Sequence, residues 1–186
     1  DGITDVLIQP THVINGIEND LMKEDALAFK NRFERITFGD PLLTTQQDHV
    51  EIVNAICQEF SNLPADCALI LMGHGTSHYA NDVYAALDYR FKDLGFSNIH
   101  LATVEGYPTL ENVTRMVKEQ EAKKVILAPF MIVAGDHARN DMSGDDEDSW
   151  KNQFRAAGYD VECRMKGLGE YPAIQDMLIR HVTEVC

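Results

Sequence analysis

Short apolar runs alternate with longer amphipathic stretches along almost the whole chain. The short runs are typical of buried strands, and the longer stretches space their apolar residues as one face of a helix does. We expect strands at 4–9, 36–38, 68–72, 98–104, 124–133 and 159–165. We expect helices at 19–35, 45–60, 79–94, 110–121, 148–157 and 172–185.

Strands that alternate with helices predict the α/β class, with parallel sheets flanked by helices. From Cys67 onward the sequence holds four strand–helix units, which is enough for one complete small domain. The residues before Cys67 hold only two such units. We therefore expect two α/β domains of the same type, a partial N-terminal one at 1–66 and a C-terminal one at 67–186.

Two segments allow more specific expectations about the core. The run from Lys124 to Val133 is the longest apolar run and is interrupted by Pro129, which indicates a central strand with a bent end. In the helix at 19–35, helical spacing selects five apolar residues as core positions, namely Leu21, Ala26, Ala28, Phe29 and Phe33.

Composition and charge exclude several classes of partner. A hydrophobic content of 45% and a charged content of 25% are ordinary for a globular protein. The formal net charge of -14 argues against binding to nucleic acid or to an anionic membrane surface, because both need a basic face. No apolar run approaches the ~20 residues that span a bilayer.

The cysteines and the start of the chain bear on the compartment. Cys57, Cys67, Cys163 and Cys186 form no C-x-x-C pair, which disfavours a zinc ribbon or a thioredoxin-type site. They favour a reducing compartment, and we expect the cytoplasm. The chain opens with Asp-Gly, without methionine and without a visible signal peptide, so a periplasmic form with a missing N-terminus is the alternative.

The candidate chemistry begins with Gly73-His74-Gly75-Thr76, which follows the predicted strand at 68–72. Ligands of open α/β sheets bind at the carboxyl ends of the strands, so His74 is well placed for chemistry. The flanking glycines let the backbone bend sharply and leave space for a bulky ligand. The alternative is a turn histidine that hydrogen-bonds to the backbone.

Two further polar groups follow the next strands. Glu105 follows the strand at 98–104, and His137 follows the run at 124–133. Two imidazoles and one carboxylate can hold divalent iron, cobalt, nickel or zinc, and either imidazole can accept a proton near neutral pH. Taken singly, Glu105 could be a carboxylate favoured by a helix N-terminus, and His137 a solvated loop residue. Three such groups at successive strand ends favour a site.

Other residues near these strand ends could contact a ligand. His12 follows the first strand and could face a cleft between the domains. An apolar wall for a flat ligand is one interpretation of Tyr107, Pro108, Phe130, Met131 and Met142, and core packing is the other. The acidic run at 145–148 is typical of a solvated helix start, with attraction of metal ions as the alternative. We expect structural or exposed roles for His49, His100 and His181.

Five segments together resemble one known family, the anaerobic cobalt chelatases. They are Gln9–Gly16, Gly73–Thr76, Thr103–Pro108, Pro129–Met142 and Gly144–Asp146. The family comprises the sirohydrochlorin cobaltochelatases of the class II chelatases, which are relatives of protoporphyrin ferrochelatase. The resemblance covers nearly all of the chain, and the block from Pro129 to Asp146 is the most specific part.

The resemblance implies two similar α/β domains with a tetrapyrrole in the cleft between them. It implies insertion of Co2+ into sirohydrochlorin on the cobalamin route, with Co2+ as a substrate. The matching metal positions are His74, Glu105 and His137. The family's first strand and following helices have no counterpart here, so we expect the N-terminal domain to be incomplete in this chain.

On this hypothesis His74 accepts a pyrrole proton, and Glu105 and His137 hold the metal beside the ring. An imidazole nitrogen cannot hold a metal and a proton together, so ligand and base roles can alternate. We expect His12, Tyr107, Met131 and Arg139 to bind the substrate. Arg139 would meet the substrate's carboxylates, and an exposed surface arginine is the alternative.

Three rival functions stay open. The same site could insert iron or nickel, because these ligands do not decide among the metals. The chain could instead bind or transport a tetrapyrrole without catalysis. A non-haem iron oxygenase also uses two histidines and a carboxylate, although fold analogy disfavours it. A homo-oligomer is compatible with the sequence.

Overall fold

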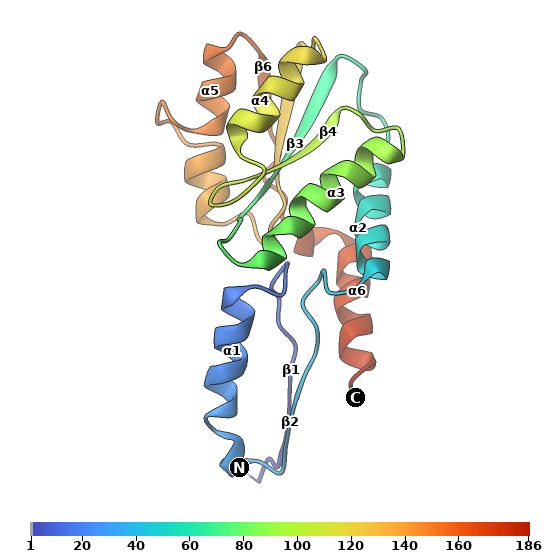
Figure 1. Cartoon of the computed structure of the whole chain (residues 1–186), viewed down its shortest axis with the longest axis vertical. Coiled ribbons are helices and arrows are strands. Elements are labelled where there is room, and N and C mark those ends of the chain that lie inside the picture. Colours follow the sequence, from blue (N-terminus) through green and yellow to red (C-terminus); the bar gives the residue numbers. More distant parts are fainter. Residues whose placement is uncertain (1) are drawn as a thin grey trace.

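Two parallel sheets of unequal size organise the chain (Figure 1). The computed structural model describes residues 2–186. In the smaller sheet, β1 (Asp5–Ile8) pairs with β2 (Arg35–Phe38). The larger sheet has the order β4-β3-β5-β6, and every pairing in it is parallel. The predicted α/β class with parallel sheets is therefore confirmed.

The larger sheet is built from β3 (Cys67–Gly73), β4 (Ile99–Thr103), β5 (Lys124–Pro129) and β6 (Asp160–Cys163). The helices are α1 (Ile17–Leu27), α2 (Gln46–Glu59), α3 (Asp82–Asp93), α4 (Leu110–Glu119), α5 (Trp150–Ala156) and α6 (Pro172–Thr183). Four further elements are single helical turns, namely η1 (Lys30–Arg32), η2 (Tyr79–Asn81), η3 (Ala138–Met142) and η4 (Leu168–Glu170). Of these, η3 is a π-helix. Among residues 2–186, no helix combines the length and apolarity that crossing a bilayer requires.

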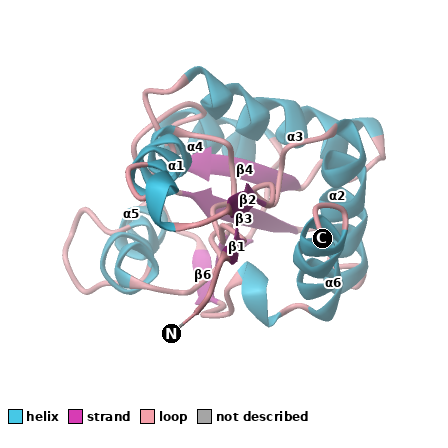
Figure 2. Cartoon of the chain, turned by 90° about the horizontal axis from the view of Figure 1, so that it is seen from below, coloured by secondary structure: helices cyan, strands magenta, loops and turns pink. Residues whose placement is uncertain are grey.

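Helices cover both faces of the larger sheet (Figure 2). Successive side chains of a strand point to opposite faces, and β3 is buried along its whole length. Leu69 and Leu71 pack with residues of α2, α3 and α6, whereas Ile70 and Met72 pack with residues of α4 and α5. This packing explains why β3 is a continuous apolar run rather than an alternating one.

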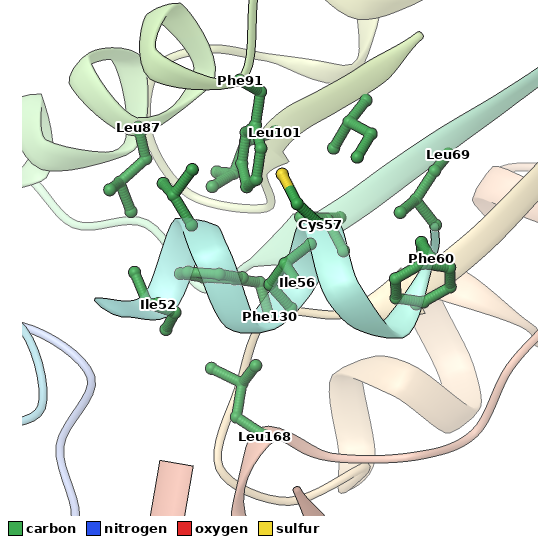
Figure 3. Packing of buried hydrophobic residues seen from close by; sticks show 14 of the residues in the cluster. Ile52, Ile56, Cys57, Phe60, Leu69, Leu87, Phe91, Leu101, Phe130 and Leu168 are labelled. Carbon is green, nitrogen blue, oxygen red and sulfur yellow. The ribbon is translucent and has the colours of Figure 1, made fainter. Parts of the chain in front are cut away.

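Helix α2 follows the smaller sheet but packs against the larger one. Its residues Ile52 and Ile56, and its C-cap residue Phe60, lie in the same core as Phe130 and Leu168 (Figure 3). The helix precedes the expected domain boundary at residue 66, yet it shares its core with the strands that follow the boundary. Helix α2, which connects the two sheets in sequence, is therefore fixed by its packing against the larger sheet.

The core positions expected in the first helix are wrong. None of the five is fully buried, and Leu21 and Phe29 are 54% and 51% exposed. The buried residue of α1 is Asn19. Two strands offer α1 too narrow a sheet to cover a full apolar face. The helix also ends at Leu27, before the predicted residue 35, because the chain must turn back to pair Arg35 with Asp5.

Strand β5 confirms the predicted central strand with a bent end. It lies between β3 and β6, and it ends at Pro129. The next residue, Phe130, is fully buried and donates its backbone N–H to the carbonyl of Met72 at 2.6 Å. Residues beyond Phe130 then leave the sheet, and Val133 is 67% exposed.

A buried ionic cluster ties α2 to α6 and to the end of the smaller sheet. The Asp48 carboxylate is fully buried and accepts hydrogen bonds from Arg180 Nη2 at 2.6 Å and from His181 Nε2 at 2.9 Å. His181 Nδ1 reaches the backbone carbonyl of Asp40 at 3.1 Å, and Thr45 donates its backbone N–H to Asp48. His181 is thus a structural residue, one of the two roles expected for it.

This cluster makes the stability of the fold fall at low pH. Burial by itself would raise the pKa of Asp48, but the hydrogen bonds from Arg180, His181 and Thr45 outweigh burial and hold that pKa well below its usual range. The pKa of this carboxyl is about 3.9 in the unfolded chain and lower in the folded protein. The ionised carboxylate therefore stabilises the fold at neutral pH, and this contribution is lost progressively as the pH falls from about 5.

We expect Asp48→Asn to lower the free energy of unfolding at pH 7 by about 3 kcal/mol. This is the lower end of the cost of breaking a buried ion pair, since Arg180 keeps Glu51 and Glu184 as partners. Urea unfolding at pH 7 and at pH 3 should show a smaller loss of unfolding free energy on acidification for the variant than for the wild type. Asp176→Asn, at an exposed position on α6, is the control. Equal losses for wild type and Asp48→Asn would refute this role.

Candidate metal centre and cleft

The carboxyl ends of three neighbouring strands meet at one edge of the larger sheet. In the parallel register, Gly73 of β3 lies opposite Thr103 of β4, and Met72 lies opposite Pro129 of β5. His74 follows β3 directly. Glu105 lies just beyond β4, where its backbone N–H donates to the carbonyl of His74 at 2.9 Å. Strand pairing therefore continues into the two loops that carry these side chains.

Three side chains converge at this edge. One nitrogen of His74, one carboxylate oxygen of Glu105 and one nitrogen of His137 all lie within 4.8 Å of one another. The two imidazole rings meet edge to face, with centroids 4.7 Å apart and an interplanar angle of 89°. These are the residues predicted at successive strand ends, and together they can converge on one divalent transition metal ion.

Each histidine has one nitrogen engaged and one left for a ligand. His74 Nδ1 lies 2.8 Å from the carbonyl oxygen of Gly75, which can only accept, so Nδ1 carries the proton and Nε2 keeps its lone pair. His137 Nδ1 lies 2.7 Å from a carboxylate oxygen of Asp141. Such a carboxylate–histidine contact orients a metal-binding ring and directs its other nitrogen to the metal.

The π-helical turn η3 positions His137 and Asp141. His137 is the N-cap of η3, and Ala138 and Met142 anchor the turn because both are fully buried. π-Helical turns are rare and are frequent at functional sites. Asp141 was not among the expected site residues, although its spacing of four residues from His137 is the signal that could have identified it.

The glycines beside His74 allow close packing of protein against protein. A Cβ atom on Gly73 would lie 2.7 Å from the Tyr84 ring. Gly75 has a φ of +82°, and its Cβ would lie 2.6 Å from the backbone nitrogen of Gly106. The space expected for a ligand beside these glycines is thus filled by Tyr84 and the Glu105 loop. Burial raises the pKa of Tyr84 to about 12, so its phenol stays protonated.

Two hollows adjoin His74 and Met131. One has a volume of about 170 Å³ and is also lined by His12, Glu18 and Tyr84. The other has a volume of about 350 Å³ and is also lined by Thr11, Ile132 and His137. Val13 lines both. Residues after β1 therefore form one wall of a cleft, and residues after β5 form the other.

The structure brings only some of the predicted ligand-contacting residues to this cleft. His12 and Met131 line it, and the buried Nδ1 of His12 has no hydrogen-bond partner among residues 2–186. Tyr107 is 58% exposed and Arg139 is exposed, and neither lines the two hollows. Phe130 and Met142 are fully buried, which confirms core packing as their role.

A second residue that sequence reasoning missed is Asn81, at the end of η2. Its side chain is almost fully buried and contacts the loops of both His74 and Glu105. No local sequence pattern identifies such a bridge, because one of the two residues that it connects, Tyr107, lies 26 residues away in the sequence.

Comparison with known proteins identifies the family of the chain. A family model described as Cobalt chelatase (CbiK) matches residues 1–186. The sirohydrochlorin cobaltochelatase of Salmonella typhimurium is 39% identical over 181 residues, which cover 97% of this chain and 68% of that protein. The sirohydrochlorin cobaltochelatase CbiKC of Nitratidesulfovibrio vulgaris is 33% identical over 186 residues, with 97% of this chain and 64% of that protein covered.

Solved structures show the same fold. The sirohydrochlorin chelatase SirB from Bacillus subtilis subspecies spizizenii, in complex with cobalt, superposes with a TM-score of 0.62 at 13% identity. That match covers 98% of this chain and 70% of SirB. SirB from Bacillus subtilis with Fe3+ gives a TM-score of 0.68 at 15% identity, with 98% and 72% covered.

We expect Asp141→Ala to weaken Co2+ binding about 10- to 100-fold, because His137 loses the partner that orients its ring. Calorimetric titration of the protein with Co2+ measures this change. Asn140→Ala is the matched control, since Asn140 lies in the same turn and its side chain bonds Asp136 instead of a candidate ligand. Equal affinities of Asp141→Ala and wild type would show that Asp141 does not support a metal site.

Proposed function

The chain belongs to the cobalt chelatase family, and from this premise we propose that it inserts Co2+ into sirohydrochlorin. The observation that carries the proposal is the convergence of His74, Glu105 and His137 at the edge of a cleft. The chain spans 68% and 64% of the lengths of its two curated relatives. We further propose that residues 1–66 and 67–186 belong to two domains, with α2 packed across the boundary.

The reaction exchanges two pyrrole protons for one metal ion. A metal-free ring and Co2+ become the metallated ring and two protons, so the site must first hold the ion and then accept protons. Co2+ is a substrate here. His74, Glu105 and His137 hold it beside the ring, and His74 accepts a proton after it has released the metal.

The free Nε2 atoms of the two histidines link these steps. One nitrogen lone pair binds either a metal ion or a proton. When Co2+ moves from His74 Nε2 to a ring nitrogen, the lone pair that it leaves can take the proton which that ring nitrogen loses. Glu105 is exposed and can pass a second proton to water. Metal release and proton uptake thus use the same atoms in sequence.

The cleft supports a flat substrate. We assign His12 and Met131 to the two walls, because His12 follows β1, Met131 follows β5, and both line the same hollow. We keep Tyr107 and Arg139 for the rim, where exposed side chains can meet substrate carboxylates. Local cations matter at such a rim, because the chain has a net charge of -14 and would otherwise repel an anionic substrate.

The direct test is the absorbance change when sirohydrochlorin is mixed with Co2+ and the protein. We expect His74→Ala and His137→Ala to lower the insertion rate at least ~100-fold, as the loss of a proton acceptor or a metal ligand does. Parallel reactions with Fe2+ and Ni2+ identify the preferred metal.

Binding of the metal-free ring is measured separately by fluorescence. Variants that bind the ring but do not metallate it would support the assignment of these histidines to chemistry. Insertion by both variants at the wild-type rate would refute the site. Ring binding without insertion by the wild type would favour a tetrapyrrole-binding protein instead.

A further inference from the structure

A single buried side chain joins the loop of His74 to the loop of Glu105. Asn81 is 7% exposed. Its Oδ1 accepts a hydrogen bond from the backbone N–H of Thr76 at 3.0 Å, and its Nδ2 donates to the backbone carbonyl of Tyr107 at 2.7 Å. Thr76 lies two residues after His74, and Tyr107 lies two residues after Glu105.

The two loops also touch directly around Asn81. A Cβ atom on Gly106 would collide with Asn81 Oδ1, and a Cβ on Gly75 would lie 2.6 Å from the backbone nitrogen of Gly106. The backbone N–H of Glu105 donates to the carbonyl of His74 at 2.9 Å. The loops therefore have little room to shift, and a relative shift would disturb the hydrogen bonds of the Asn81 amide.

We propose that Asn81 is a positioning residue that holds His74 and Glu105 at the separation the metal requires. The inference rests on the proposed function only in that both need a metal at this site. An amide can accept with its oxygen and donate with its nitrogen from one rigid plane, which suits two loops that present an N–H and a C=O. Without Asn81, each loop keeps its strand, but their relative position loosens.

The first experiment compares Co2+ binding by wild type, Asn81→Ala and Asn81→Asp. We expect Asn81→Ala to bind Co2+ about 10-fold more weakly and to change the visible absorption bands of bound Co2+, which report its ligand geometry. Aspartate can still accept from Thr76 but cannot donate to Tyr107 when ionised. Asn81→Asp should therefore show the same spectral change, because the loop of Glu105 is released.

Asn112→Ala is the matched control. Asn112 lies in the first turn of α4, just beyond the Glu105 loop, and completes the capping box by accepting from the backbone N–H of the N-cap residue Thr109 at 2.9 Å. Its removal should lower the melting temperature without changing the Co2+ spectrum. If Asn81→Ala also melts earlier but keeps the wild-type Co2+ affinity and spectrum, Asn81 has only a structural role and the proposal is wrong.

A double-variant cycle with Gly106→Ala tests the mechanism. The added methyl group should displace the Asn81 amide and mimic its loss, so we expect about a 10-fold weaker Co2+ affinity. In the Asn81→Ala background the same methyl group no longer meets the Asn81 side chain and keeps only its contact of 3.1 Å with the backbone nitrogen of Thr76, so most of its effect should disappear. Additive effects of the two substitutions would overturn the proposal.

Turnover separates this inference from the proposed function. If the chain binds Co2+ with the expected dependence on Asn81 but never metallates sirohydrochlorin, the inference stands and the chelatase function fails. If insertion occurs, we expect Asn81→Ala to lower kcat about 10-fold and to change the KM for sirohydrochlorin less than kcat, because the substitution loosens the loops of two metal ligands and leaves the cleft walls at His12 and Met131 in place.

Discussion

The candidate site depends on the parallel pairing of β3 with both β4 and β5. Parallel strands end at the same edge, so His74, Glu105 and His137 emerge together although they are far apart in sequence. A shift of register by one residue would turn each strand's core side chains to the opposite face. The tight burial of β3 between two helical layers resists such a shift. The core thereby sets the geometry of the chemistry at its edge.

The three candidate ligands are held by different means. The backbone pairing of β3 and β4 extends into the loops of His74 and Glu105, and the Asn81 side chain hydrogen-bonds to both loops. His137 lies at the end of a longer loop after Pro129, and it is positioned by a π-helical turn and by Asp141. Both histidines leave Nε2 free, but one donates Nδ1–H to a carbonyl and the other to a carboxylate. The two imidazoles therefore have different hydrogen-bond partners, a neutral carbonyl for His74 and a carboxylate for His137, which suits a reaction in which they play different parts.

The elements and the strand-end residues could be predicted from sequence because apolar runs, turn glycines and parallel topology are local signals. The α/β class, the bent end of β5 and the identity of the converging residues required no more than these. Leu21 and Phe29 were misassigned because helical spacing marks an apolar face but not whether a sheet is wide enough to cover it. Asn81, Asp48 and His181 act through partners that are distant in the sequence, so no spacing rule reveals them. Arg139 is exposed and lines neither hollow although it lies two residues after His137, and its contact with the substrate stays a prediction.

Anomalous scattering at the cobalt edge, measured on crystals of the protein soaked with Co2+, locates the metal centre without reference to activity. We expect one strong peak within bonding distance of Nε2 of His74, Nε2 of His137 and a carboxylate oxygen of Glu105. The same peak should vanish in crystals of His74→Ala. A peak confined to the acidic run at 145–148, or an unchanged peak in His74→Ala, would contradict the assignment of the metal centre to the strand ends.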